Sequence, residues 1–491
     1  MQNNRLMQNN RRFNLSVLAL AISVTFSSKG YAQDDAESRI RELESKVQQL
    51  IQQRTEQDKQ IDLLTKELVG ISNQVSQSKI EKSEEKGASK GKPIYGGFKD
   101  GLTFEDGTGS WKLQLNGRIQ ADYRYFSPDD WKADTFSIRR ARLGGTFSFL
   151  KDFAVRVEGE YANANDGSKG TTALTYGYLD FTRWSGAKIR AGQFKPFFGL
   201  ERSQSSNFTD FTELSLATGN GSIFNSTYDR GLMVHGDPLP WLNYNLYAVN
   251  GTGQNNDDVK DSKDVGARVN ANFAKFTDNK KLVLHAGASI SKGSIDFSSS
   301  TKSIKQVTEA NGVEFFNVGT LNNVTSTTDR SRLGFEGAAV YGPVKLQAEY
   351  IKANFEGRQG AANAFDNDIK TWYADINWLM TGESYADSYK SGIFGRINPK
   401  NNLDEKSGWG AFELGLRYSK FDASDFKAIL ASPTANTSEA DAWTVGAKWI
   451  FNPNARLLLN YIQTNFDTDL VINGKSDDKE KALNLRAQYD F

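Results

Sequence analysis

Three arginines stand within four positions of the segment FSIRRARLGGTFSF, which covers residues 136–149. Arg139, Arg140 and Arg142 each carry a guanidinium group, whose fixed fork of N–H donors matches the oxygens of phosphate or carboxylate. The group also stays charged at any working pH. The spacing therefore predicts an anion-binding surface, provided that the side chains share one face of the element that carries them.

The neighbouring residues predict that this element is a β-strand with two different faces. Apolar Leu143 and Phe147 share one parity, and adjacent residues of a strand point to opposite sides. Arg140 and Arg142 are therefore predicted to project together from the polar face. Two further basic pairs without adjacent acids have the polar parity of their own segments, and these are Arg118 with Arg124 and Lys188 with Arg190.

The chain lacks the residues that catalysis and metal binding usually require. It has no cysteine and only two histidines, His235 and His285, neither with a serine motif nearby. Thiol chemistry, a disulfide framework and thiolate metal sites are excluded. A serine nucleophile assisted by histidine is not indicated. We therefore predict that the protein is not an enzyme and uses neither a cofactor nor a metal.

The N-terminus predicts export. Two arginines precede an apolar stretch at residues 13–26, and small residues end at Ala32, which is the pattern of a cleaved signal peptide covering residues 1–32. This leader holds four of the 60 basic residues and no acid, so the mature chain has 56 bases against 59 acids, a net charge of −3. That balance does not indicate a nucleic-acid partner.

Residues 33–86 predict a coiled coil. Apolar residues recur at alternating steps of three and four among helix formers, which is a heptad seam. Because the other faces are polar, the seam needs partner chains, and we expect a parallel trimer in the periplasm, with Arg54 and Gln57 as a register device. A linker covering residues 87–110 leads into the next domain. The seam residues are Ile40, Leu43, Val47, Leu50, Ile61, Leu64, Leu68, Ile71 and Val75.

From residue 111 to residue 491 the apolar period changes to two. No apolar run of 18 residues follows the N-terminal stretch, which excludes a helical membrane protein. Sixteen segments alternate, and the first exceeds the usual length of a soluble strand. The even number, with short joins after every second segment and long polar joins elsewhere, predicts a closed antiparallel β-barrel in the outer membrane. The expected strands are 111–126, 135–149, 152–163, 173–184, 187–194, 228–237, 241–251, 263–276, 281–293, 330–342, 343–355, 368–380, 408–422, 440–452, 455–467 and 480–491.

The fold class is therefore all-β, a 16-stranded antiparallel transmembrane barrel preceded by an α-helical coiled coil. A soluble β-sandwich or a β-solenoid would also alternate. Strand length, the signal peptide and the chain end favour the membrane, because terminal Phe491 and Tyr489 match the C-terminal signal that the barrel-assembly machinery recognises. The join at residues 381–408 is long where a short turn is expected, so either the register slips there or this turn is elaborated.

A barrel gives the remaining basic residues a location. The loop that starts at Lys195 and contains Arg202 is rich in Phe, so we expect it to fold inward and to place both cations at a constriction. Arg139 has the lipid-facing parity near the start of its strand. We expect it to meet lipopolysaccharide phosphates or a neighbouring subunit, unless a local bulge turns it inward.

Five stretches resemble the phosphate-selective porin O and P family over roughly residues 95–491. The resemblance implies a trimeric sixteen-stranded outer-membrane channel whose lumen binds phosphate-like anions. The stretches are FSIRRARLGGTF, KIRAGQFKPFFGLE, DRGLMVHG, LMTGE at 379–383 and FGRINP at 394–399.

We therefore predict passive, anion-selective uptake through the outer membrane of a Gram-negative bacterium, with inorganic phosphate or polyphosphate as the solute. The expected partners are outer-membrane lipid and lipopolysaccharide, two further copies of the chain and the barrel-assembly machinery. Two alternatives stay open. One is a general small-solute porin with structural lumen charges, and the other is an adhesin or envelope tether in which the barrel is an anchor.

Overall fold

The computed structural model separates residues 1–91 from residues 92–491, and the second unit contains the barrel. It describes eight residues between 45 and 60, all helical, and every residue from 94 onward except 99–100, 163–171, 220, 222, 225, 259–260, 296–303, 319–327, 360–362 and 405. The predicted signal peptide and the apolar seam of the predicted coiled coil lie outside the described residues. Among the described residues, no helix is long and apolar enough to cross a membrane.

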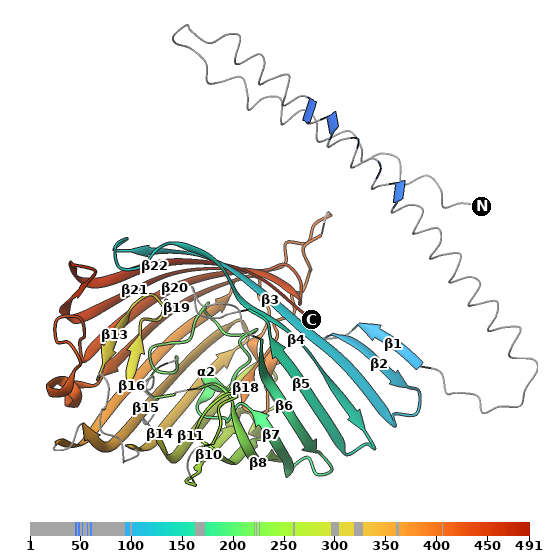
Figure 1. Cartoon of the computed structure of the whole chain (residues 1–491). Coiled ribbons are helices and arrows are strands. Elements are labelled where there is room, and N and C mark those ends of the chain that lie inside the picture. The colour runs from blue at the N-terminus through green and yellow to red at the C-terminus, as the bar shows by residue number, and fades with distance from the viewer. Residues whose placement is uncertain are drawn as a thin grey trace, which may run out of the picture. The chain divides into compact units, whose positions relative to one another are not determined.

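Sixteen strands of the described chain form one antiparallel barrel, as the sequence predicted (Figure 1). Each strand pairs with the next in the chain, and the last pairs with the first, with Asp490 opposite Arg118, which closes the sheet. The strands are β3 Trp111–Ser127, β4 Thr135–Phe149, β5 Phe153–Glu160, β6 Ala173–Phe181, β7 Lys188–Phe194, β8 Asp229–Leu239, β9 Leu242–Val249, β10 Asp264–Asn272, β11 Leu282–Ile295, β14 Thr328–Tyr341, β15 Val344–Gln359, β16 Asn363–Leu379, β19 Ala411–Asp422, β20 Glu439–Ile450, β21 Ala455–Ile472 and β22 Lys475–Asp490.

Alternation along each strand produces the two faces of the wall. On β20, Trp443 and Val445 are exposed on the outside, whereas Thr444 and Lys448 are buried inside. The outward aromatic side chains form contacts across strands, such as Tyr418 with Trp443 at 4.8 Å between ring centroids. Such a surface is stable in lipid, because the closed sheet leaves no unpaired backbone edge in the hydrocarbon layer.

A small hairpin precedes the barrel. β1 (Ile94–Phe98) pairs with β2 (Leu102–Asp106), and β2 pairs with the first residues of β3. The C-terminal residue ends β22 at the same place, where the backbone of Phe491 exchanges hydrogen bonds with Gly117. The hairpin therefore continues the sheet beyond the end of the last strand.

The long join between β16 and β19 is an elaborated turn, and the register does not slip. It contains the 3-10 helix η2 (Tyr385–Ser388) and the short pair β17 (Tyr389–Lys390) and β18 (Ile393–Phe394). Arg268 of the wall donates to the Gly392 carbonyl at 2.8 Å, so the turn folds into the lumen from the end where the short turns lie. The remaining 3-10 helices are η1 (Phe273–Phe276) and η3 (Ser424–Ile429).

Two further segments fold into the lumen. The first is the loop after β7, residues 195–228, here called L3, which contains helix α2 (Leu200–Ser203). Its inward course, predicted from the sequence, is confirmed by hydrogen bonds to the opposite wall, such as Leu200 N–H to Glu349 at 2.8 Å. The second, which the sequence did not predict, is residues 304–318, here called the L5 tip, with β12 (Lys305–Val307) and β13 (Glu314–Asn317).

The L5 tip fills part of the lumen with apolar side chains. Phe315 and Phe316 are fully buried, and both rings lie against Phe421 of the wall at 5.3–5.4 Å between centroids. The same cluster includes buried apolar residues of β15, β16, β19, β20 and β21. This half of the lumen is therefore packed like a protein core, and a polar solute has to pass elsewhere.

Candidate anion site

Arg139 corrects one prediction from the sequence, since it does not face lipid. Between β3 and β4 the pairing steps from Gln120 opposite Arg140 to Ala121 opposite Ile138, so Arg139 is the extra residue of a β-bulge. The bulge turns the side chain inward, where its Nε donates to Glu213 Oε1 of L3 at 2.7 Å. Of the two locations considered for Arg139, the inward one is therefore present.

L3 brings two more cations to the face that carries Arg140 and Arg142. Lys195 is buried, and its ammonium donates to two backbone carbonyls of L3, at Arg202 and Gln204. Arg202 is also buried and donates to the carbonyls of Thr218 and Ser226 at 3.0 and 2.6 Å. Both side chains are thus held by neutral oxygen atoms.

Arg140 and Arg118 complete the group from the wall. Arg140 donates to Gln120 Oε1 at 2.8 Å, and Arg118 donates to the Ser206 hydroxyl of L3 at 2.6 Å. Within the described part of the chain, no salt bridge involves Arg140, Lys195 or Arg202, whereas the carboxylate of Glu158 lies 3.9 Å from Arg118. Three basic side chains therefore have no carboxylate partner there.

Arg142 differs from these three because it is paired. Its Nε donates to Glu160 at 2.6 Å, and Glu158 lies at 3.5 Å. Its Nη1 also donates to a neutral partner, the hydroxyl of Tyr228, at 2.7 Å. Arg142 therefore adds hydrogen-bond donors to the site, but it adds less net positive charge than an arginine without a carboxylate partner would.

A cavity of about 70 Å³ is lined by Arg140, Arg142, Lys195 and Arg202, while Arg118 does not line it. A water needs about 10–15 Å³ on this measure, so the cavity has room for roughly five waters, or for a small oxyanion with part of its hydration. The L5 tip forms one wall with residues 306–309 and 311. The other lining includes Arg139, Arg140, Arg142, Lys195, Arg202, Gln204, Ser206, Thr209 and Glu213.

The titration of the L3 residues reflects this charge distribution. Burial holds the pKa of Lys195 well below its usual range, and Arg202, Arg142, Arg118 and Arg140 lower it further by repulsion. Burial likewise lowers the pKa of Arg202 to about 9. An anion in the cavity would oppose both effects, because it favours the charged form of each group.

Glu213 shows the opposite behaviour. Burial raises the pKa of its carboxyl group, but Arg139, Arg124 and Arg486 outweigh burial and hold the pKa well below its usual range. Glu213 is therefore the fixed counter-charge for three guanidinium groups and ties L3 to β3, β4 and β22.

The structure places the other candidate residues in ion pairs or away from the cavity. Arg124 pairs with Asp122 at 2.9 Å and Glu213 at 2.5 Å. Arg190 pairs with Asp180 through two bonds of 2.7 and 2.8 Å. Lys188 stands opposite His235 near the start of β7 and does not line the cavity.

Sequence reasoning missed the L5 tip as part of this site. The tip lies in a long polar join, which resembles an ordinary exposed loop. The adjacent aromatic pair Phe315 and Phe316 was the available signal, because two consecutive buried rings are unusual in a solvated loop.

Comparisons with known proteins match the part of the chain that forms the barrel. The family model for phosphate-selective porin O and P matches residues 113–491. Porin O of Pseudomonas aeruginosa is 25% identical over 418 residues, covering 80% of this chain and 91% of that protein. The outer membrane channel DcaP of Acinetobacter baumannii is 14% identical, with a TM-score of 0.48, and the match covers 79% of this chain and 99% of that one. The trimer form of OmpT from Vibrio cholerae is 13% identical, with a TM-score of 0.46 and coverage of 78% and 100%.

Proposed function

The chain belongs to the phosphate-selective porin O and P family, and from that premise we propose that its lumen conducts anions selectively, with inorganic phosphate or polyphosphate as the solute. As a member of this family it is a channel of the outer membrane. Transport is passive, because nothing in the proposal requires a chemical step.

The observation that carries the proposal is a group of three basic side chains at the cavity that form no salt bridge within the part of the chain that the structure describes. Arg140, Lys195 and Arg202 have no carboxylate partner among the described residues. A buried cation without a counter-ion is costly, and a diffusible anion removes that cost. The binding stays reversible when the anion meets several such groups in succession, which lets it leave as well as enter.

The packing of the lumen supports a route along the same wall. The apolar cluster around the L5 tip occupies the side of β15, β16 and β19–β21. The basic residues that line the cavity lie on β4 and L3, and β4 contributes no residue to that cluster. We infer that anions pass between L3 and the basic wall, and that Arg118 and Arg142 are met on the same path.

We further propose that the mature chain forms a homotrimer, with residues 33–86 as a periplasmic coiled coil, after export through a cleaved signal peptide. In the same proposal, lipopolysaccharide contacts the outer surface, and the barrel-assembly machinery recognises Phe491. Purified native assemblies of the chain with and without residues 36–85 test the coiled coil. An unchanged oligomer and unchanged envelope attachment would refute its role and the tether alternative.

Single-channel recording in planar bilayers tests the function. We expect a reversal potential that shows preference for anions in a salt gradient, and block of the chloride current by millimolar phosphate. The alternative of a general porin is favoured by the ion pairs of Arg124 and Arg190. It predicts weak selectivity and no phosphate block, so this result would refute the anion proposal.

A further inference from the structure

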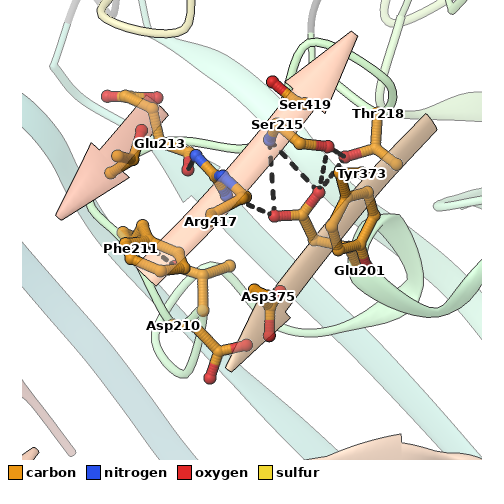
Figure 2. A network of polar contacts seen from close by, with 12 residues as sticks. Glu201, Asp210, Phe211, Glu213, Ser215, Thr218, Tyr373, Asp375, Arg417 and Ser419 are labelled. Carbon is orange, nitrogen blue, oxygen red and sulfur yellow. Dashed lines mark hydrogen bonds and ion pairs between the residues drawn. The ribbon is translucent and has the colours of Figure 1, made fainter. Parts of the chain in front are cut away.

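Two inward segments meet at one buried arginine on the far side of the lumen. Arg417 on β19 is completely buried, and its Nη1 donates to Glu201 Oε1 of L3 at 2.9 Å. Its Nη2 donates to Glu309 Oε2 of the L5 tip at 2.8 Å. One guanidinium group therefore pairs with a carboxylate from each segment. Figure 2 shows the contact between Arg417 and Glu201 of L3.

Both carboxylates are held by further donors. Glu201 accepts hydrogen bonds from the hydroxyls of Ser215 and Thr218, which lie later in L3 (Figure 2). Glu309 accepts the N–H of Leu216 at 3.1 Å and the hydroxyl of Thr444 at 2.7 Å. L3 and the L5 tip are thus joined to each other as well as to Arg417.

Shape complementarity adds to the charge. Phe211 of L3 lies over the guanidinium group of Arg417 at 4.5 Å. Its ring occupies a notch formed by Gly415 and Gly446, which are opposite each other on β19 and β20. A Cβ at Gly415 or Gly446 would lie 3.0 or 2.9 Å from that ring, so the close approach of L3 to the wall requires glycine at both positions.

Arg417 does not line the anion cavity, but its partners do. Glu201, Ser215, Leu216 and Glu309 all line the cavity. We propose that Arg417 is a positioning residue that sets the width of the anion path by clamping L3 and the L5 tip to β19. This inference rests on the proposed anion function for its effect on phosphate, while its effect on conductance is independent of it.

The clamp has a physical basis in the two carboxylates. Without the guanidinium group, Glu201 and Glu309 become buried like charges without their shared counter-ion, and leaving buried charges unpaired in this way is strongly destabilising. The loops can avoid part of that cost by moving apart and hydrating the carboxylates. Such a movement widens the lumen and separates the cavity walls.

The experiment compares the full-length wild-type channel with R417Q in planar bilayers. We expect the chloride conductance to rise by about twofold or more and the concentration of inorganic phosphate for half-block to rise by about tenfold or more, as a displaced wall loses at least one charged contact. R268Q is the matched control, because Arg268 is an equally buried wall arginine that pairs with Glu336, and its side-chain hydrogen bonds among the described residues go to neither L3 nor the L5 tip. R268Q is expected to keep the phosphate block within about twofold of wild type.

A disulfide distinguishes positioning from simple loss of charge. The chain has no cysteine, and Gly221 of L3 forms an antiparallel bridge with Gln306 of the L5 tip, so a cysteine pair there can cross-link. In R417Q with G221C and Q306C, oxidation is expected to restore most of the phosphate block and reduction to remove it. If R417Q does not assemble, G446A takes its place in the same measurements, because a Cβ there displaces the Phe211 ring from its notch without changing any charge.

Unchanged conductance and block in R417Q would overturn the inference, and so would an equal effect in R268Q or failure of the oxidised pair to restore block. If wild type itself shows no anion preference, the proposed function fails. The conductance of R417Q then still decides whether the clamp exists.

Discussion

Arg140 and Arg124 allow a direct comparison of a free cation with a paired one. Among the described residues, Arg140 donates only to the neutral oxygen of Gln120, whereas Arg124 pairs with Asp122 and Glu213. Replacing Arg140 by Met should therefore weaken anion binding and leave the fold intact. Replacing Arg124 by Met should destabilise the fold and leave anion binding largely unchanged.

The expected magnitudes follow from the contacts. A hydrogen bond to a charged group contributes about 1.5–3 kcal/mol, so R140M should weaken the phosphate block by roughly 10- to 100-fold. Its stability should fall by no more than about 1–3 kcal/mol, because the buried oxygen of Gln120 loses its donor while no carboxylate is left unpaired. Breaking a buried pair costs about 3–5 kcal/mol, and R124M should approach the lower value, since Arg486 and Arg139 still contact the same carboxylates.

Two measurements check the comparison. Phosphate block of the chloride current gives the half-block concentration for wild type, R140M and R124M. Urea unfolding in detergent, followed by tryptophan fluorescence, gives the loss of stability. The reasoning is refuted if phosphate blocks R140M at the same half-block concentration as wild type, or if a folded R124M loses as much phosphate affinity as R140M.

Three other predictions concern Lys195, the L5 tip and the binding of phosphate. Because the pKa of Lys195 is depressed and a bound anion raises it, affinity for sulfate is full below the depressed pKa and should fall as pH rises through it. Sulfate keeps one charge state over this range, and K195R should remove the slope up to about pH 9, where Arg202 begins to titrate; a flat wild-type profile would contradict this. The double variant F315A/F316A should raise the chloride conductance, since each Phe→Ala change in a packed core costs about 3–5 kcal/mol and opens space; unchanged conductance would show that this half of the lumen is sealed by other residues. Phosphate at about 100 times its dissociation constant should stabilise the barrel by about 2.7 kcal/mol in the same unfolding assay, and the same concentration should stabilise R140M by only about 0.4–1.4 kcal/mol, because its binding is 10- to 100-fold weaker.

The sequence predicted the barrel well because lipid imposes a strict alternation on every strand. Sixteen strands, closure and the short turns follow from a period of two and from join lengths, and the structure confirms them. Arg139 escaped this logic, because a single bulged residue reverses parity and leaves no trace in residue type. The elaborated turn after β16 was visible only as a length that did not fit.

Within the candidate site, the strand residues could be placed by parity but not sorted by partner. Arg140 and Arg124 have the same residue type and the same lumen parity, yet only Arg124 meets a carboxylate of L3. That difference depends on where L3 positions Glu213, which is a contact between residues 89 positions apart. Pairing across a lumen is set by loop conformation, and local sequence patterns contain no record of it.

The charges of the lumen explain why the two loops and the anion path belong together. L3 presents Glu213 to the guanidinium groups of Arg124, Arg139 and Arg486, and Glu201 on the same loop pairs with Arg417 across the lumen. The acids of L3 are thus used to fix its position on two walls, and they are not available to Arg140, Lys195 or Arg202. A loop that neutralised every cation would also hold its position, but it would leave no charge for a solute. Separating the anchoring pairs from the unpaired cations allows one loop to be rigid and to present an anion site at the same time.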